Sequence, residues 1–537
     1  MVFNKINIMK RILSLISLII SLISCDNLLD LQPYGVVSTE SFYQTAEDAD
    51  KAVTAAYKSF QVLDGQNTWN TRAGYTPMGD ITCADAQAHP DLVCYYQIQQ
   101  SIVRSNSDQV LMLYQRCYKA LRLANMALEE IPHINMDEKL KSRYLGELYF
   151  IRGFWLFRLG YMFGTAPVVT KTLNVSELNI PNSTRIVKKD NSKSVNNYKI
   201  EKSDLFDQAE ADFLQALQLG LANRNSGDMM GRIDNGTVKS YLVQIYLYEH
   251  RWEEAKRQLE DIMSYGYELL PNYADLFCGL YDNNAESIFE VQYTALNQKG
   301  TDNFGTVLNA PNGEGFVAGG GWGWTRPTPD LEREYEEGDP RLVCTMFRKG
   351  IDDFYGQVFD DKVNGTGLGT RKWCISSDGG VTVDRVSWNN SCNYALIRYA
   401  EILLWYAEVV NELGDQKTAA EYVNMVRART ATTPNPNTVN VTETKEMKPI
   451  SSNLTYEEMF WAIVHERRVE LAMEGKFGWD LRRWGIGEKV LLDPDRWQNE
   501  VVAGYFKYDE DKDVIFPIPL LEIQRSDGVL QQNSGYE

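Results

Sequence analysis

The sequence has few of the residues on which metal and nucleotide chemistry depends. Its 537 residues include only 4 histidines and 8 cysteines, and their spacing matches no metal-binding motif. The densest glycine tract, Gly319–Gly323, does not stand between a strand pattern and a helix pattern, so it does not indicate a phosphate-binding loop. A serine-nucleophile elbow is also absent. We therefore expect no metal site and no other cofactor.

Basic residues are fewer than acidic residues as well. The chain has 54 lysines and arginines against 73 aspartates and glutamates, which gives a formal net charge of −19. Residues 1–24 contain Lys5, Lys10 and Arg11 but no acid, so the rest of the chain carries −22. A surface this acidic repels polyanions. We expect no nucleic acid partner and no docking on a surface of anionic lipid.

Cysteines suited to a disulfide framework are missing. The seven cysteines that follow Cys25 are widely spaced: Cys83, Cys94, Cys117, Cys278, Cys344, Cys374 and Cys392. An odd number at such spacing predicts neither a network of disulfides nor a metal knuckle. Only Cys83 and Cys94 are close enough in sequence to close a local loop, and the sequence leaves open whether they are paired.

Long apolar runs are limited to one, at the start of the chain. Ile12–Ile23 follows the basic pair Lys10-Arg11 and is too short to span a bilayer comfortably, which is typical of a cleaved secretory signal. Leu22-Ile23-Ser24-Cys25 resembles a bacterial lipobox, in which the cysteine becomes the acylated first residue of the mature protein. An ordinary signal with an incidental cysteine is the alternative, and Met9 is an alternative start.

Helical patterns dominate the rest of the chain, and the clearest lies at Tyr394–Thr430. Apolar residues from Leu396 to Val410 recur at steps of three and four, which predicts an amphipathic helix. Leu413-Gly414-Asp415 then interrupts the pattern, because glycine accepts the left-handed conformation that ends a helix and aspartate can cap the next one. A second amphipathic run follows at once. This spacing predicts two antiparallel helices joined by a short link.

The same arrangement recurs at Val238–Tyr265. An aromatic residue in the first helix precedes a small alanine in the second by fourteen residues in both places: Tyr241 and Ala255 in one, Trp405 and Ala419 in the other. This spacing resembles a tetratricopeptide unit, and one such unit needs neighbours to cover its apolar face. Weaker candidates are Leu113–Glu130, and Lys139–Gly164 with Asp204–Gly220. Ordinary helices of an unrelated α domain are the alternative.

Five further segments stand out by their composition. Residues 147–164 are apolar nearly all round and predict a buried helix, whereas residues 287–293 alternate and predict a strand. Residues 174–202 are polar and predict a surface loop. Residues 64–107 and 294–393 are long, irregular and aromatic, and long irregular segments inside a compact domain are usually functional.

A charged cluster near the C-terminus can be interpreted either as a catalytic site or as a structural network. Glu466, Glu470 and Glu474 fall four residues apart on one predicted helix face, and two carboxyl groups can catalyse glycoside cleavage. Arginines between and after them, such as Arg467 and Arg483, keep carboxylates ionised, whereas a general acid needs a raised pKa. We favour arginine–carboxylate pairs that lock helices together.

Taken in order, these motifs resemble the SusD/RagB family of outer-membrane nutrient-binding lipoproteins over essentially the whole chain. The residues that carry the resemblance are Cys25 with Leu28-Leu29-Asp30 and Pro33; Arg152-Gly153-Phe154, Phe163-Gly164 and Pro167-Val168-Val169; Ile288-Phe289-Glu290-Val291; Gly338-Asp339-Pro340-Arg341; Arg398-Tyr399-Ala400-Glu401-Ile402-Leu403-Leu404, Ala407-Glu408 and Val426-Arg427-Ala428-Arg429; Glu466-Arg467-Arg468, Glu470-Leu471, Glu474-Gly475, Asp480-Leu481 and Arg483-Trp484; and Pro517-Ile518-Pro519 with Gln532-Asn533. Lys476-Phe477-Gly478-Trp479 departs from the family, which often has an arginine there.

The resemblance implies a mostly α-helical fold, with a tetratricopeptide-like helical-repeat scaffold, an irregular loop-rich lobe and a few short strands. We accordingly expect a signal peptide at 1–24, a lipid-anchored extended arm at 25–45 and one SusD-like domain at 46–537. Within that domain, we expect the scaffold at about 46–293 and 394–537, and the lobe mainly at 64–107 and 294–393.

The resemblance also implies a binding protein, not an enzyme. It would sit on the outer face of the outer membrane, capture an oligosaccharide or less often a peptide, and deliver it to a SusC-like TonB-dependent transporter. Our own candidate contacts are stacking platforms at Trp322 and Trp324, side walls at Tyr75 and Tyr95, and hydroxyl partners at Asn67, Asp80 and Asp85. A surface glycosidase and a protein-docking repeat scaffold are the alternatives. For Trp322 and Trp324, as for Trp373 and Trp388, packing outside the repeat domain is the structural alternative.

Overall fold

The computed structural model of the chain describes residues 42–61, 75–83, 85–89, 92–294, 304–313, 316, 320–360, 365–372, 374–375, 383–384, 389–439, 441–494, 496 and 506–536. Cys25, Asn67, Trp373 and Trp388 lie outside these residues. Of Tyr75, only the backbone is described. Across the described ranges, no helix has the length and apolar character needed to cross a membrane.

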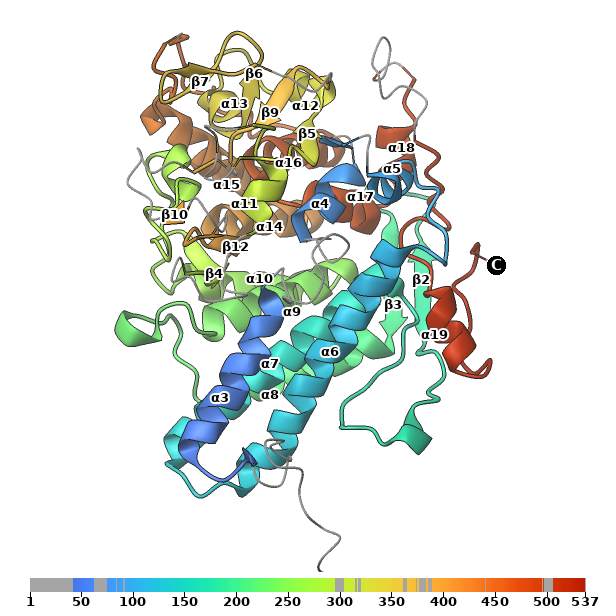
Figure 1. Cartoon of the computed structure of the whole chain (residues 1–537). Coiled ribbons are helices and arrows are strands. Elements are labelled where there is room, and N and C mark those ends of the chain that lie inside the picture. Colours follow the sequence, from blue (N-terminus) through green and yellow to red (C-terminus); the bar gives the residue numbers. More distant parts are fainter. Residues whose placement is uncertain are drawn as a thin grey trace, which may run out of the picture.

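The scaffold is a row of helices that follow one another in space roughly as they do in sequence (Figure 1). Its members are α3 (Ala46–Tyr57), α6 (Asp108–Glu130), α7 (Glu138–Phe163), α8 (Asp204–Gln218), α9 (Asn235–Tyr248), α10 (Trp252–Met263), α14 (Tyr399–Glu412), α15 (Gln416–Ala428) and α16 (Tyr456–Leu471). Each helix packs on the next, and α10 packs on α14 although 135 residues lie between these two helices in the sequence. The predicted helical-repeat fold is confirmed.

The link between α14 and α15 has the structure that its sequence predicts. Gly414 is left-handed at φ +86°, and the Asp415 side chain accepts a hydrogen bond from the Thr418 backbone N–H at 3.0 Å. Both alanines of the predicted repeat, Ala255 and Ala419, are completely buried. A larger side chain at either position would push the paired helices apart.

The centre of the scaffold is aromatic. Phe154 of α7 lies 4.9 Å from Phe60 and 5.1 Å from Tyr241 of α9, measured between ring centroids, and Phe60 also meets Phe289 at 5.1 Å. These edge-to-face contacts join three helical segments and a strand. The prediction that residues 147–164 form a buried helix is confirmed.

Two predictions about the scaffold need correction. The strand predicted at residues 287–293 is present as β4 (Ser287–Val291), but its antiparallel partner is β12 (Tyr394–Arg398), where we expected the start of a helix. Pairing with β4 satisfies the backbone groups of β12, so α14 begins only at Tyr399. The polar segment 174–202, expected as a loop, contains the hairpin of β2 (Arg185–Lys189) and β3 (Tyr198–Ser203).

The two irregular segments contain short elements that the sequence did not predict. The first contains α4 (Tyr75–Ile81), β1 (Ala86–Ala88) and α5 (Val93–Gln99); the second contains α11 (Phe304–Asn309), β5 (Thr325–Pro327), α12 (Pro329–Glu334), α13 (Pro340–Thr345), β6 (Met346–Arg348), β7 (Asp353–Phe354), β8 (Gln357–Val358), β9 (Leu368–Thr370), β10 (Val383–Asp384) and β11 (Asn389–Asn390). We call these two segments together the lobe. The chain then ends with α17 (Phe477–Trp484), α18 (Gly487–Leu491) and α19 (Leu520–Arg525). The seven cysteines after Cys25 are free, so Cys83 and Cys94 are not paired.

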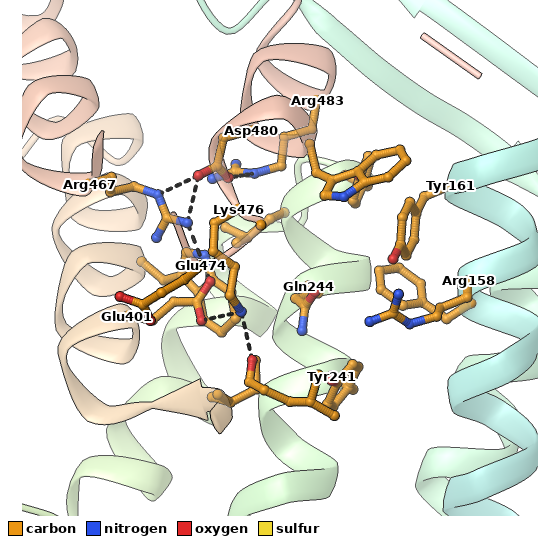
Figure 2. Close-up of a pocket in the computed structure, with 18 of the residues that line it drawn as sticks. Arg158, Tyr161, Tyr241, Gln244, Glu401, Arg467, Glu474, Lys476, Asp480 and Arg483 are labelled. Atoms are coloured by element: carbon orange, nitrogen blue, oxygen red, sulfur yellow. Dashed lines mark hydrogen bonds and ion pairs between the residues drawn. The ribbon is translucent and has the colours of Figure 1, made fainter. Parts of the chain in front are cut away.

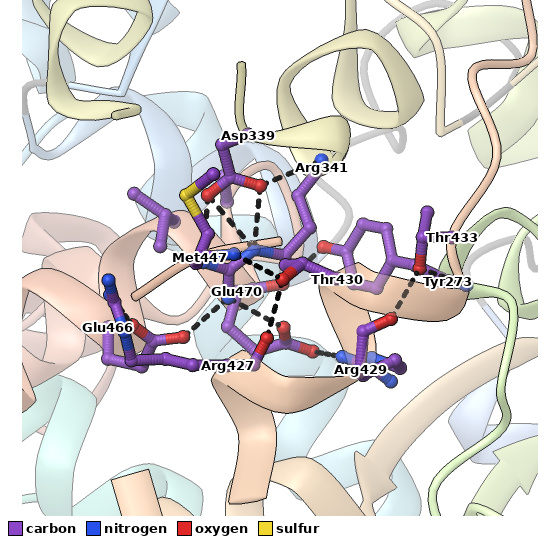
Figure 3. A network of polar contacts seen from close by, with 12 residues as sticks. Tyr273, Asp339, Arg341, Arg427, Arg429, Thr430, Thr433, Met447, Glu466 and Glu470 are labelled. Carbon is purple, nitrogen blue, oxygen red and sulfur yellow. Dashed lines mark hydrogen bonds and ion pairs between the residues drawn. The ribbon is translucent and has the colours of Figure 1, made fainter. Parts of the chain in front are cut away.

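A buried network of arginines and carboxylates joins the scaffold to the lobe (Figure 3). Arg341 of α13 contacts Glu466 of α16 at 2.5 Å and Glu470 at 3.2 Å. Arg398, at the end of β12, contacts Glu470 at 2.6 Å and Glu286 at 2.9 Å. The prediction that the charged cluster forms arginine–carboxylate pairs is confirmed.

Because the network is buried, each of its charges contributes to stability only while its partners are present. A buried charge that loses its partner is strongly destabilising, whereas an exposed pair contributes little. Arg429, Arg398 and Arg341 together hold the pKa of Glu470 well below its ordinary value despite the opposing effect of desolvation. Removing any one of these arginines would therefore leave Glu470 a buried anion with too little compensation.

We predict that Arg398→Met lowers the free energy of unfolding by about 3–5 kcal/mol, because it leaves Glu286, Glu470 and Glu474 facing one another without the cation that they share. Lys445→Met is the matched control, since Lys445 pairs with Glu337 on the surface and should change stability by about 1 kcal/mol or less. Urea unfolding at pH 7 measures both. Equal losses in the two variants would contradict the role of the network.

Candidate functional site

The tryptophan tract, by which we mean residues 320–324 of the lobe, has a backbone that is hydrogen-bonded on both sides. Trp322 and Trp324 donate their backbone N–H groups to the carbonyls of Val307 and Leu308, both at 2.8 Å. On the other side, the Trp324 carbonyl accepts from the His89 N–H at 2.9 Å, next to the pairing of β5 with β1. The position of both indoles is therefore set by the frame of α11, β5 and β1.

The glycines of the tract have a backbone role. A Cβ on Gly321 would lie 2.2 Å from the Pro311 carbonyl oxygen and 2.6 Å from that of Ala310, so only glycine allows this approach. Gly323 is left-handed at φ +59°. These glycines let the chain lie tightly against the segment that follows α11.

Three of the predicted aromatic residues come together here, in two layers. Trp324 is 8% exposed and Tyr95 of α5 is 2% exposed, and their rings meet edge to face with centroids 5.6 Å apart. The Trp322 ring lies 6.0 Å from that of Trp324 and is only partly buried. Of the three residues, Trp322 is therefore the most exposed, and the Trp324 ring contacts the rings of both Trp322 and Tyr95.

The two predicted acidic contacts lie in the interior. Asp85 is fully buried and accepts from Arg468 Nε at 2.7 Å, and Asp80 is 1% exposed and accepts from the Gly475 backbone N–H at 2.8 Å. Burial raises the pKa of Asp85 to about 6 even beside this arginine. Neither carboxyl group can reach a sugar hydroxyl from there, so our assignment of Asp80 and Asp85 as ligand contacts is wrong for this structure.

Arg468 of α16 connects the tract to the scaffold, a role that our sequence reasoning missed. Besides Asp85, which stands just before β1, its guanidinium contacts Asp330 at 2.6 Å and Glu334 at 2.7 Å, both on α12. Arg496 adds a contact to Asp330 at 2.8 Å. One side chain thus holds both segments of the lobe. The sequence shows the motif Glu466-Arg467-Arg468 but not its distant partners.

An internal cavity lies between α7, α9, α14 and α17 (Figure 2). Its volume is about 70 Å³, space for about two water molecules. Lys476 donates to Glu401 at 2.8 Å and to the Leu396 carbonyl at 2.6 Å, and Arg467 pairs with Asp480 at 2.7 Å. This cavity is a polar part of the interior and is too small for a sugar.

The carboxyl groups of α16 and of the segment that follows it are bound by cations, which is unfavourable for acid–base chemistry on a sugar. The pKa values of Glu470 and Glu474 are lowered by their arginine and lysine neighbours, the opposite of what a general acid needs. Burial raises the pKa of Asp282 to about 7 and also raises that of Glu290. Glu290, however, lines cavities of only about 40–50 Å³ and is held by Asn283 and Asn393. In the part of the chain that the structure describes, no three His, Cys, Asp or Glu side chains are grouped to hold a metal.

Two family models match the chain. One, described as the SusD family, matches residues 285–536, and the other, described as starch-binding associating with outer membrane, matches residues 28–247. A SusD-like protein of Formosa agariphila is 22% identical over 98% of this chain and 100% of its own length. A SusD-like protein of Bacteroides ovatus is 24% identical over 86% of this chain and 79% of its own.

Solved structures agree with these matches. A laminarin-binding SusD-like protein has a TM-score of 0.71 to this chain at 25% sequence identity and covers 92% of this chain and 100% of its own. Surface glycan-binding protein A from Bacteroides thetaiotaomicron, in complex with laminarihexaose, has a TM-score of 0.71 at 20% identity and covers 91% of this chain and 100% of its own. The second of these similarities shows the fold alone.

The two tryptophans should respond differently to truncation. We predict that Trp324→Ala lowers the free energy of unfolding by about 3–5 kcal/mol, as expected for a buried ring, whereas Trp322→Ala changes it by about 1 kcal/mol or less because its ring is partly in solvent already. Thermal and urea unfolding of the two variants test this. A larger loss for Trp322→Ala than for Trp324→Ala would show that Trp322 is the supporting ring.

Proposed function

Because this chain belongs to the SusD/RagB family, we propose that it is a cell-surface lipoprotein that binds an oligosaccharide and passes it to a partner TonB-dependent transporter of the outer membrane. Lipid attachment at Cys25 would tether the soluble domain through the arm at residues 25–45. The transporter would receive the ligand directly, so the protein needs a binding surface and no catalytic group.

The observation that carries the proposal is the placement of Trp322. An indole face matches the C–H face of a pyranose ring. It binds a ligand most tightly when its position is already fixed before the ligand arrives, because no conformational freedom is then lost on binding. The backbone hydrogen bonds at Trp322 and Trp324 and the packing of Trp324 on Tyr95 supply that order. A laminarin-binding SusD-like protein of the same fold, 25% identical to this chain, supports a glycan as the ligand.

The contacts that we propose are fewer than those expected from the sequence. Trp322 is the stacking platform, and Trp324 and Tyr95 position it from below without touching the sugar. Asn67 and the side chain of Tyr75 remain proposed contacts, outside the described residues. Loops on either side of the tract would supply the hydrogen-bonding groups that distinguish one linkage from another.

A glycan array that includes laminarihexaose identifies the ligand, and calorimetry on variants then tests the site. We predict that Trp322→Ala weakens binding of the best glycan by more than about 1 kcal/mol, the size expected of an aromatic anchor, without loss of thermal stability. Trp252→Ala is the matched control, because Trp252 is a partly buried tryptophan on α10 of the scaffold, stacked on His250. Unchanged affinity in Trp322→Ala would contradict the assignment.

The glycosidase alternative predicts a chemical product. Incubation of the purified protein with its best glycan should release no new reducing ends over hours, because the arginine-bound carboxylates of α16 cannot act as general acids. Release of reducing ends that is lost in a carboxylate variant such as Asp282→Asn would show an enzyme.

Purification of the protein from solubilised membranes tests the proposed partner. Co-purification of a large β-barrel supports the transporter complex, and co-purification of a different set of proteins supports the docking scaffold.

A further inference from the structure

A second, larger cavity is lined by residues of α6, of the segment at residues 167–180, and of α19 and the chain that follows it. In Figure 1 these elements lie apart from β5, which follows the tryptophan tract. Its volume is about 630 Å³, within the range of about 300–1,000 Å³ that small-molecule sites occupy. The rings of Tyr114 and Tyr118, with centroids 4.9 Å apart, and the side chains of Val169 and Leu530 give it a largely apolar lining.

The walls of this cavity are held in place by hydrogen bonds to α6. Tyr118 donates its hydroxyl to the Pro167 carbonyl at 2.8 Å, and Asn125 donates to the Val169 and Lys171 carbonyls at 3.3 and 3.2 Å. On the opposite side, Gln115 donates to Glu522 of α19 at 2.8 Å. The cavity is therefore bordered by α6 and by two further segments that are both hydrogen-bonded to this helix.

The mouth of the cavity exposes apolar surface. Leu178 is 58% exposed, and nearby Val175, on the 3₁₀ turn Val175–Glu177, is 88% exposed. The side chains of Asn174 and Glu177 form a capping box that holds this turn. Exposed apolar side chains beside an apolar cavity are typical of a binding site, because a ligand would cover them.

The charge of the lining is opposite to that of the molecule. Three of the four charged residues in the lining are cationic, Arg122, Lys171 and Arg525, and the fourth is Glu522, whereas the whole chain carries −19. Lys171 is paired with Glu177 and Arg525 with Glu522. Arg122 has no ion pair to any residue that the structure describes, and its side chain is exposed. The mouth therefore offers one uncommitted guanidinium above an apolar floor.

We propose that this cavity binds a small amphiphile that has an apolar chain or ring and a single anionic head group, with the head group at Arg122. The apolar floor favours a hydrocarbon body over a sugar, and the Tyr118 hydroxyl in this floor already donates to the Pro167 carbonyl. The net negative charge of the protein opposes docking on a whole anionic membrane surface, but one guanidinium can pair with one head group. Such a ligand could be a free fatty acid or a single membrane lipid, and the site is separate from the proposed glycan site.

Fluorescence of 8-anilinonaphthalene-1-sulfonate, an apolar aromatic sulfonate, tests the proposal on the full chain carrying Cys25→Ser, so that no acyl chain of its own competes. Dodecanoate below its micelle concentration should displace the probe at least about fivefold better than dodecyltrimethylammonium, as expected for one charge-assisted contact. Arg122→Gln should remove most of this preference. Arg257→Gln is the matched control, because Arg257 is an exposed arginine on α10, and it should leave displacement unchanged.

Two further variants keep the test sharp. Leu173→Trp, which fills the cavity, should weaken every amphiphile whatever its head group, whereas Trp322→Ala should have no effect. Flotation with vesicles of phosphatidylglycerol then separates the two sources: binding that Arg122→Gln abolishes identifies a membrane lipid, and dodecanoate binding without vesicle binding identifies a free amphiphile. Equal displacement by the anionic and cationic amphiphiles, or an equal effect of Arg122→Gln and Arg257→Gln with unchanged melting temperatures, would overturn the proposal.

Discussion

The buried contacts between arginines and carboxylates around α16 are the constraint on which the rest of this structure depends. One face of this helix presents Glu466 and Glu470 to Arg341, Arg398 and Arg429, and another presents Arg468 to Asp85 and Asp330. Each contact joins α16 to a segment far away in sequence. Because a buried charge is tolerated only when it is fully paired, these segments can occupy only the positions that complete the pairing.

That constraint extends to the proposed binding surface. Arg468 fixes Asp85 at the start of β1, β1 pairs with β5, and the chain leading into β5 carries Trp322 and Trp324. The scaffold and the lobe are therefore not independent units with a flexible joint between them. A stacking surface held in this way loses little conformational freedom when a ligand binds, which favours affinity. In this protein, buried charges thus help to orient a partly exposed ring.

Local features were the predictable part of this protein. The helix end at Gly414, the cap at Asp415 and the buried alanines Ala255 and Ala419 depend on neighbours within one or two turns, so the sequence pattern shows them. The strand at Tyr394–Arg398 was missed because its apolar residues also fit a helical period, and only β4, a hundred residues earlier, selects the extended form. The helix pairs and the repeat class therefore followed from the sequence, whereas the strands of β12 and of the β2–β3 hairpin and the short elements of the lobe did not.

The candidate site shows the same limit. Trp322, Trp324 and Tyr95 were identified by composition, and the structure brings them together, but composition could not show which ring is accessible. Asp80 and Asp85 resembled ligand contacts because polar residues in an aromatic loop usually face solvent. Their actual partners, Gly475 and Arg468, are more than 380 residues away in sequence, and no local pattern reveals such a contact.

The most direct test of the account is a crystal structure of this protein with the glycan that binds it best. We expect a sugar ring stacked on the Trp322 indole, with Trp324 and Tyr95 unmoved beneath it and the Arg468 contacts intact. A glycan bound elsewhere, with no atom in contact with the Trp322 ring, would contradict the central claim.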